Sequence, residues 1–322
     1  MRNRVFPAFA AALAFFACSA SADYPDQPIR LVVPFAAGGG TDVMGRMFGQ
    51  KLSESWRVPV VVDNRPGAGG TIGSAAVAKA NPDGYTVLLG SISTHAISPA
   101  LYAKMPYDPM KDFVPIARAG ITPFVMTIHP GVPANTVGEL IALAKASPNK
   151  YDYASSGNGT TSHLCGALFT QLAGVQMNHI PYKANAPGLT DLLGGRVTFM
   201  FDNIIAMQPH IRAGKLKALA VTGQERVSSL PGVPTMIEAG LPAYEVIGWF
   251  GLWVPAGTPR PVAAKLTNEF ARIMREPDVK ARAEEQGVDF SQQQTGDEFG
   301  GFVQKEIVKW RRIARDAGAK LD

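Results

Sequence analysis

Short runs of β-branched residues alternate with helical patterns along nearly the whole chain of 322 residues. The run 29–34 (IRLVVP) predicts a buried strand, and the apolar residues of 41–56 recur at helical spacing. Further strands are predicted at 58–63 and 85–90, with a helix between them at 72–79. Such alternation is typical of parallel strands with helices packed on the faces of the sheet. The first third of the chain is therefore predicted to form a β-α-β-α-β unit.

A second unit of the same kind is predicted from about residue 124 onward. Thr136 and Glu139 have the spacing of a capping box, which predicts a helix start there, and the helix must end before Pro148. The other predicted elements of this unit are strands at 124–128, 151–155, 177–182, 197–201 and 216–222 and helices at 162–173 and 187–193.

The last part of the chain predicts how the two units are joined. A run rich in aromatic and β-branched residues at 246–254 is followed by three amphipathic helical segments, whose apolar faces need a sheet to cover. We expect these helices to return to the first unit. This gives a discontinuous first domain of residues 23–123 plus 250–322 and a second domain of residues 124–249. The fold class is thus α/β with two domains, and a cleft between them is a common place for a ligand.

The amino terminus has the features of a signal peptide. Arg2 and Arg4 precede an apolar run at 5–17 that is too short to span a bilayer, and Ala20-Ser21-Ala22 follows as a cleavage pattern. We therefore expect export and a mature chain that begins at Asp23. Lipidation of Cys18 is the alternative, although the residues before it lack the usual leucine and small residue.

Charge and cysteine content exclude several classes of protein. Two of the 31 Lys and Arg residues and none of the 26 Asp and Glu residues lie in 1–22, so the remaining 300 residues carry a net charge of only +3. No run of Lys or Arg exceeds the pair Arg311-Arg312, which argues against a nucleic-acid partner. Beyond the signal peptide only Cys165 remains, and the five histidines are scattered singly. We expect no disulfide, no metal and no cofactor.

Two turns between a strand and a helix predict a ligand site. They are 34–42 (PFAAGGGTD) in the first unit and 155–163 (SSGNGTTSH) in the second. The first amides of a helix lack intrahelical partners and lie at the positive end of its dipole, so they bind anions without a cationic side chain. Either turn alone is typical of an ordinary helix start. Because both follow the carboxyl end of a strand, together they favour a shared anion site.

Other motifs have simpler interpretations. The segment 64–73 (NRPGAGGTIG) has the wrong glycine spacing for a dinucleotide site and is predicted to be a loop beside the cleft. Asp202 follows a predicted strand, where its carboxylate could meet a ligand amine or hydroxyl or could cap a turn. A hydrolase that uses Ser162 or Ser156 remains the alternative class, although no G-x-S-x-G elbow exists and we expect no catalytic residue.

An ordered set of segments resembles the Bug family, the extracytoplasmic receptors of tripartite tricarboxylate transporters. The resemblance extends over the whole predicted mature chain. It rests on YPDQPIRLVVPFAAGGGTDVMGR, DNRPGAGGTIGSAAVAKANPDGYTVLLG, YASSGNGTTSHLCGALF, HIPYKANAPGLTDLLGGRV, HIRAGKLKALAVTG and GVPTMIEAGLPAYEV…WFGLWVPAGTP. The sequence departs from the usual family pattern at Ala184 and Cys165.

This resemblance implies a two-lobed periplasmic-binding-protein fold, or flytrap, in which each domain is a mixed sheet flanked by helices. It implies capture of a small organic carboxylate, delivery to membrane transporter subunits, a periplasmic location and no catalysis; we expect a monomer. Asp202 matches the position that discriminates among ligands. The other matching ligand-binding positions are Phe35, Ala37, Gly39, Thr41 and Asp42 in the first turn and Ser156, Gly159, Thr160, Thr161 and His163 in the second.

Overall fold

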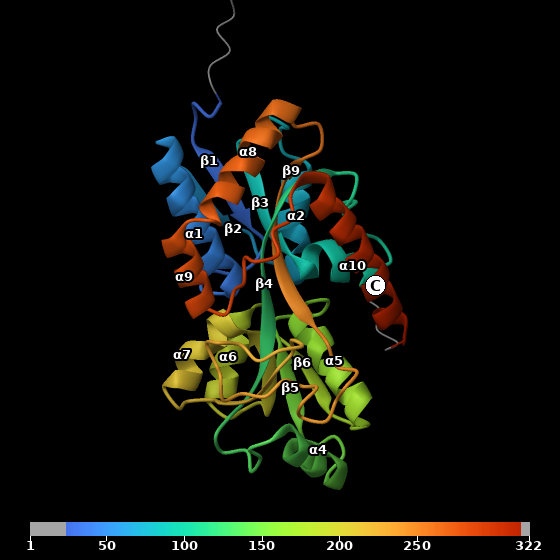
Figure 1. The fold of residues 1–322 in the computed structure, drawn as a ribbon. Helices are drawn as coiled ribbons and strands as arrows, with labels where there is room; N and C mark the ends of the chain where they lie inside the picture. Colours follow the sequence, from blue (N-terminus) through green and yellow to red (C-terminus); the bar gives the residue numbers. More distant parts are fainter. Residues whose placement is uncertain (1–23, 317–322) are drawn as a thin grey trace, which may run out of the picture.

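The computed structural model describes residues 24–316, which form two lobes arranged end to end (Figure 1). The predicted signal peptide, its cleavage site and Cys18 lie outside the described residues. Both termini of the described chain belong to the lobe drawn at the top of Figure 1, here called the first lobe. Within residues 24–316, no helix combines the length and apolar character that a membrane span requires.

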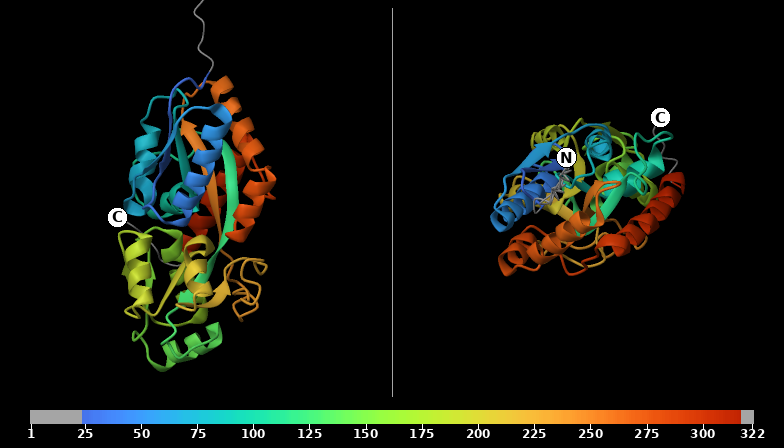
Figure 2. Two further views of the ribbon diagram at one scale, coloured as in Figure 1. Left: turned by 90° about the vertical axis from the view of Figure 1, so that its left-hand side faces the viewer. Right: turned by 90° about the horizontal axis from the view of Figure 1, so that it is seen from above.

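The first lobe is built on a mixed sheet. The strand β1 (Ile29–Val33) pairs in parallel with β2 (Val60–Asn64) and β3 (Thr86–Ser91), as the alternating pattern predicts. The strand β9 (Ile247–Pro255) then runs antiparallel to β3. Helices cover both faces (Figure 2); they are α1 (Gly40–Trp56), the 3-10 helix η1 (Ala68–Gly70), α2 (Thr71–Ala78), the π-helix η2 (Ser93–Ile97), α3 (Ser98–Leu101), α8 (Arg260–Ile273), α9 (Pro277–Glu285) and α10 (Gly296–Asp316).

The second lobe repeats the arrangement on a smaller scale. Its strand β5 (Asp152–Ser155) pairs in parallel with β6 (Asn178–Pro181) and β7 (Phe199–Asn203). The end of β4 (Phe113–Ile128) adds antiparallel pairs with β7 and with β8 (Lys217–Val221). The helices of this lobe are α4 (Val137–Ala146), α5 (Thr161–Ala173), α6 (Asn185–Leu193) and α7 (Ile204–Arg212).

Two long antiparallel strands, β4 and β9, connect the lobes. Residues Phe113 to Pro123 of β4 pair with β9, and from Phe124 onward β4 pairs with β7 and β8 instead. The predicted domain boundary between 123 and 124 falls at this change of partner, and the division of the chain at 123/124 and 249/250 stays a prediction. A strand starting at 124 is wrong, because β4 begins at Phe113. Its first part, FVPIARAGIT, contains proline, arginine and glycine and so lacks a strand pattern.

Most predicted helices and strands occur within a few residues of their expected limits. Of the capping box predicted at the start of α4, the N-cap half is confirmed, since Thr136 Oγ1 accepts the N–H of Glu139 at 3.1 Å. The Glu139 carboxylate accepts the N–H of Asn135 at 2.6 Å rather than that of Thr136. Gly174 ends α5 in the left-handed conformation. The sequence analysis missed η2, α3 and α7, which are short and, in α7, contain Pro209.

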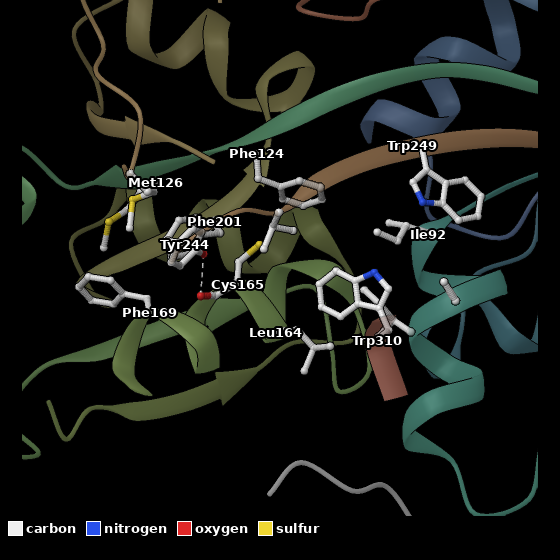
Figure 3. Close-up of a cluster of buried hydrophobic side chains, with 14 of the residues drawn as sticks. Ile92, Phe124, Met126, Leu164, Cys165, Phe169, Phe201, Tyr244, Trp249 and Trp310 are labelled. Carbon is white, nitrogen blue, oxygen red and sulfur yellow. Dashed lines mark hydrogen bonds between the residues drawn. The ribbon is translucent and has the colours of Figure 1, made fainter. Parts of the chain in front are cut away.

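One hydrophobic cluster extends across both lobes. Trp310 of α10 is 1% exposed, and Figure 3 shows its indole between Leu164 of the second lobe and Ile92 of the first. Glu306 accepts hydrogen bonds from two indoles, Trp249 Nε1 at 3.0 Å and Trp310 Nε1 at 3.3 Å. The carboxyl-terminal helix therefore packs against the connecting strands as well as against the first lobe.

Truncation of Trp310 tests this packing. Trp310→Ala is expected to lower the free energy of unfolding by about 3–5 kcal/mol, because it leaves a cavity and removes a buried indole. Val308 lies two residues away on the same helix and is 64% exposed, so Val308→Ala should change stability by less than about 0.5 kcal/mol. Chemical denaturation measures both variants. Equal stabilities would show that α10 does not contribute to the shared core.

Candidate functional site

A cavity of about 150 Å³ lies between the lobes. One wall comes from the first lobe: the turn 34–41, part of the loop 66–70 and the turn 91–93. The opposite wall comes from the second lobe: Ser156, residues 160–162, residues 183–186 and the end of β7. The connecting strands close the space between the walls with Phe124, Gly248, Trp249 and Phe250. The turns at the starts of α1 and α5, predicted to share one site, thus face the same cavity.

The first turn presents backbone amides at the start of α1. The N–H groups of Gly39, Gly40 and Thr41 have no hydrogen-bond partner within residues 24–316. Gly38 has a φ of 83°, which glycine adopts without strain, and its N–H donates to Asp42 Oδ2 at 2.9 Å. The turn therefore leaves the first amides of α1 free at the positive end of the helix dipole.

The Asp42 carboxylate shapes this turn from behind and does not line the cavity. It accepts hydrogen bonds from Arg46 Nε at 2.9 Å and Asn64 Nδ2 at 3.0 Å as well as from Gly38. Burial opposes ionisation, but these hydrogen bonds and the Arg46 charge lower the pKa of Asp42 below its ordinary value. Asp42 is thus an ionised support for the turn.

The second turn is fixed by Thr160, the N-cap of α5. Its hydroxyl donates to the carbonyl of Gly157 at 2.7 Å and accepts the N–H of His163 at 3.4 Å. The N–H groups of Ser156 and Ser162 have no partner within the described part of the chain. Both residues line the cavity, so this wall also offers unpaired amides.

His163 and Gly159 support the second turn without lining the cavity. Gly159 N–H donates to His163 Nδ1 at 3.4 Å, and the His163 ring stacks on His179 with centroids 4.2 Å apart. His179 Nε2 lies 2.7 Å from Ser155 Oγ. Burial lowers the pKa of His163 to about 4. Burial and the neighbouring His163 lower the pKa of His179 to about 3. Both rings are therefore neutral at pH 7 and stack without charge repulsion.

Asp202 is a buried carboxylate in the cavity wall. It is 4% exposed, its Oδ1 accepts the N–H of Asn203 at 2.6 Å, and its Oδ2 accepts from the Asn185 side chain. Burial raises the pKa of Asp202 to about 7, against the hydrogen bonds from Asn203. Among the residues that line the cavity, the only cationic side chain is the exposed Lys183.

Eight of the eleven predicted ligand-binding residues line the cavity: Phe35, Ala37, Gly39, Thr41, Ser156, Thr160, Thr161 and Asp202. The other three, Asp42, Gly159 and His163, lie behind its wall, because their side chains or amides bond within the turns. The segment predicted as a loop beside the cleft contributes Pro66, Gly67, Gly69 and Gly70.

Sequence reasoning missed Asn185, Asn203 and the turn 91–93. The turn 91–93 could have been found, since it also follows the carboxyl end of a parallel strand.

Neither predicted serine has the surroundings of a nucleophile. Ser162 Oγ donates to the carbonyl of Phe201 at 2.5 Å and is 2% exposed. Ser156 Oγ makes no hydrogen bond to a histidine or carboxylate within residues 24–316. Across the same residues, His, Cys, Asp and Glu side chains nowhere gather in threes as a metal site requires. The arrangement is suited to holding an anion through backbone donors.

Known proteins are similar to this chain over most of its length. Protein BugT of Bordetella pertussis is 39% identical over 312 residues, which cover 96% of this chain and 95% of BugT. The solved structure of R. palustris Rpa4515 with adipate has a TM-score of 0.88 and 36% identity, with 93% of this chain and 100% of that chain covered. MatC (Rpa3494) from Rhodopseudomonas palustris with bound malate has a TM-score of 0.85 and 33% identity, with coverages of 90% and 99%.

These similarities confirm the two-lobed α/β binding-protein fold and the predicted resemblance to Bug proteins. The model of the tripartite tricarboxylate transporter family receptor, TctC, matches residues 44–319. That span includes α1 from Met44 onward, the whole second lobe and the return to the first. The chain therefore belongs to the TctC family of tripartite tricarboxylate transporter receptors.

Proposed function

We propose that this receptor captures one small organic carboxylate between its lobes and delivers it to the membrane subunits of a tripartite tricarboxylate-type transporter. It would do so in the periplasm, after removal of the predicted signal peptide, as a monomer and without chemical conversion of the ligand. No metal or cofactor takes part in this proposal.

The observation that carries the proposal is the pair of helix N-termini facing one cavity. The free amides of Gly39, Gly40 and Thr41 lie on one wall, and those of Ser156 and Ser162 belong to the other. A buried anion requires hydrogen bonds that replace its hydration, and helix N-termini supply them together with a favourable dipole. Because each lobe provides part of the set, the complete site exists only when the cleft is closed.

The size and charge of the cavity narrow the ligand. Its volume of about 150 Å³ is below the roughly 300–1,000 Å³ typical of drug-sized pockets, which favours a compact molecule. In this proposal the backbone amides bind a carboxylate of the ligand, and the remaining polar group of the ligand lies near Asp202. Adipate and malate in the structures of two relatives support this class and are suitable first ligands to test.

Substitution of Ser156 tests the backbone site. Titration calorimetry with malate, adipate and an amino acid should identify one ligand that binds the wild-type protein at one site per chain. That ligand should not be converted to a product. Ser156→Ala should weaken that ligand by about 1 kcal/mol at most, because main-chain donors remain. Ser156→Asp should abolish binding, since its carboxylate repels the anion and competes for the free amides.

Thermal unfolding provides the control, because Ser156→Asp should unfold within a few degrees of wild type. Retained affinity in a folded Ser156→Asp protein would place the anion elsewhere. Ligand conversion to a product, detected by chromatography and lost in Ser156→Ala or Ser162→Ala, would instead support a hydrolase.

Asp202 is expected to set which ligand is preferred. Asp202→Asn removes a carboxylate that repels a second ligand carboxylate and attracts an amine or hydroxyl donor. Dicarboxylates should therefore gain affinity relative to amino acids by about tenfold, a change of roughly 1.4 kcal/mol. A thermal-shift panel with both classes measures the ranking. An unchanged ranking would assign Asp202 a purely structural role.

The pH dependence of affinity follows from the same carboxyl. Burial raises the pKa of Asp202 to about 7, and a bound dicarboxylate favours the protonated form of Asp202. Binding of a dicarboxylate is therefore linked to uptake of a proton by Asp202. Affinity for a dicarboxylate should fall several-fold as pH rises from 6.5 to 8.5, where the ligand itself stays ionised. Asp202→Asn should give a flat profile in calorimetry. A wild-type affinity that rises with pH would indicate a cationic group beside Asp202.

A further inference from the structure

Ser93 joins the two lobes across the edge of the cavity. Its Oγ lies 2.9 Å from Thr161 Oγ1 and accepts the N–H of Thr161 at 3.1 Å. Ser93 is the first residue of η2, one residue beyond the end of β3 in the first lobe, with Ile92 between them, and Thr161 is the first residue of α5 in the second lobe. The two contacts therefore bridge elements that stand on different lobes.

The turn that carries Ser93 is held rigidly. The N–H of Ser93 donates to Ser91 Oγ at 3.3 Å, and Thr94 Oγ1 donates to the carbonyl of Ser91 at 3.0 Å. The next residue, His95, stacks on Trp253 with ring centroids 3.7 Å apart. Single π-helical turns of this kind are frequent at functional sites. The Ser93 hydroxyl is therefore presented to the second lobe from a fixed position.

The partner of this hydroxyl is a buried amide. Thr161 is 2% exposed, and a buried N–H without a partner is costly. When the cleft opens, water can solvate this amide. When the cleft closes, water leaves and Ser93 Oγ takes its place. The hydrogen bond therefore stabilises the closed arrangement and contributes nothing to the open one.

The lobes also touch at two glycines. A Cβ at Gly69 would lie 3.2 Å from the carbonyl oxygen of Asn158, and a Cβ at Gly40 would lie 3.2 Å from Asn203 Cβ. Each glycine belongs to the first lobe and each neighbour to the second. Three contact points, at Ser93, Gly69 and Gly40, thus surround the cavity.

We propose that Ser93 is a positioning residue that latches the closed cleft through Thr161. The proposal rests on the proposed function and adds a division among the amides of the second turn and the start of α5. The amide of Thr161 is used to close the protein, which leaves those of Ser156 and Ser162 for the ligand. Ser93 thereby sets affinity through the population of the closed state rather than through a contact with the ligand.

Single-molecule fluorescence energy transfer between the lobes measures that population directly. Dyes can be placed on Lys79→Cys and Lys145→Cys, which are exposed on opposite lobes, in a chain without residues 1–22, where Cys165 is buried. The variants are Ser93→Ala, Thr161→Val and Ser98→Ala. Ser98 Oγ is buried close to η2 and has no hydrogen-bond partner among the residues that the structure describes, so Ser98→Ala is the matched loss of a hydroxyl.

Ser93→Ala should lower the closed-to-open ratio about three- to tenfold, both without ligand and with malate or adipate. By the same factor, it should raise the dissociation constant of whichever acid binds the wild-type protein. Thr161→Val should have a smaller effect, because its N–H still reaches Ser93. Ser98→Ala should match wild type.

An unchanged ratio in Ser93→Ala, or a wild type in which no closed state is detected, would overturn the latch. A weaker affinity with an unchanged ligand-free ratio would also overturn it and make Ser93 a ligand contact. Failure of every acid to bind wild type would refute the proposed function, while the ligand-free ratio would still decide the latch.

Discussion

The antiparallel pairing of β4 with β9 holds the two lobes together and determines where the cleft lies. The two strands pair from Phe113 with Pro255 to Pro123 with Ile247, after which β4 continues into the second sheet. Their crossing is tightly packed, since a Cβ on Gly248 would lie 2.8 Å from the carbonyl oxygen of Thr122. Because the walls of the cavity are attached to opposite ends of these strands, a small rotation about the crossing would move the two helix N-termini relative to each other.

The site depends on polar groups that the protein leaves incompletely paired. Free amides at Gly39, Gly40 and Ser162 face the cavity, and Asp202 is buried without a cation beside it. Such groups cost stability in a folded protein, and they are characteristic of places that bind or react. Behind them, Asp42 supports the first turn, and the stacked pair His163 and His179 supports the second. The unpaired groups are thus presented by rigid surroundings.

Prediction from sequence succeeded where local chemistry decides the outcome. The turn 34–42 follows a strand of apolar residues and precedes a helical pattern, so its place at the start of α1 could be read directly. The family resemblance placed Asp42 of this turn among the ligand-binding positions. In the structure its carboxylate turns back to Gly38, Arg46 and Asn64, and Asn64 is supplied by β2. Where such a side chain points depends on a neighbouring strand, which the local pattern does not contain.

The sequence by itself determined the alternation of strands and helices, the two turns at the starts of α1 and α5 and the family, because each depends on residues close together in the chain or on an ordered set of motifs. The tertiary structure alone decided that the two turns face one cavity of about 150 Å³ and that Ser93 reaches Thr161. It also decided that Asp202 is buried enough to raise its pKa. These features depend on contacts between segments tens of residues apart. Their physical reason is the pairing of β4 with β9, and the first half of β4 carries no strand pattern in the sequence.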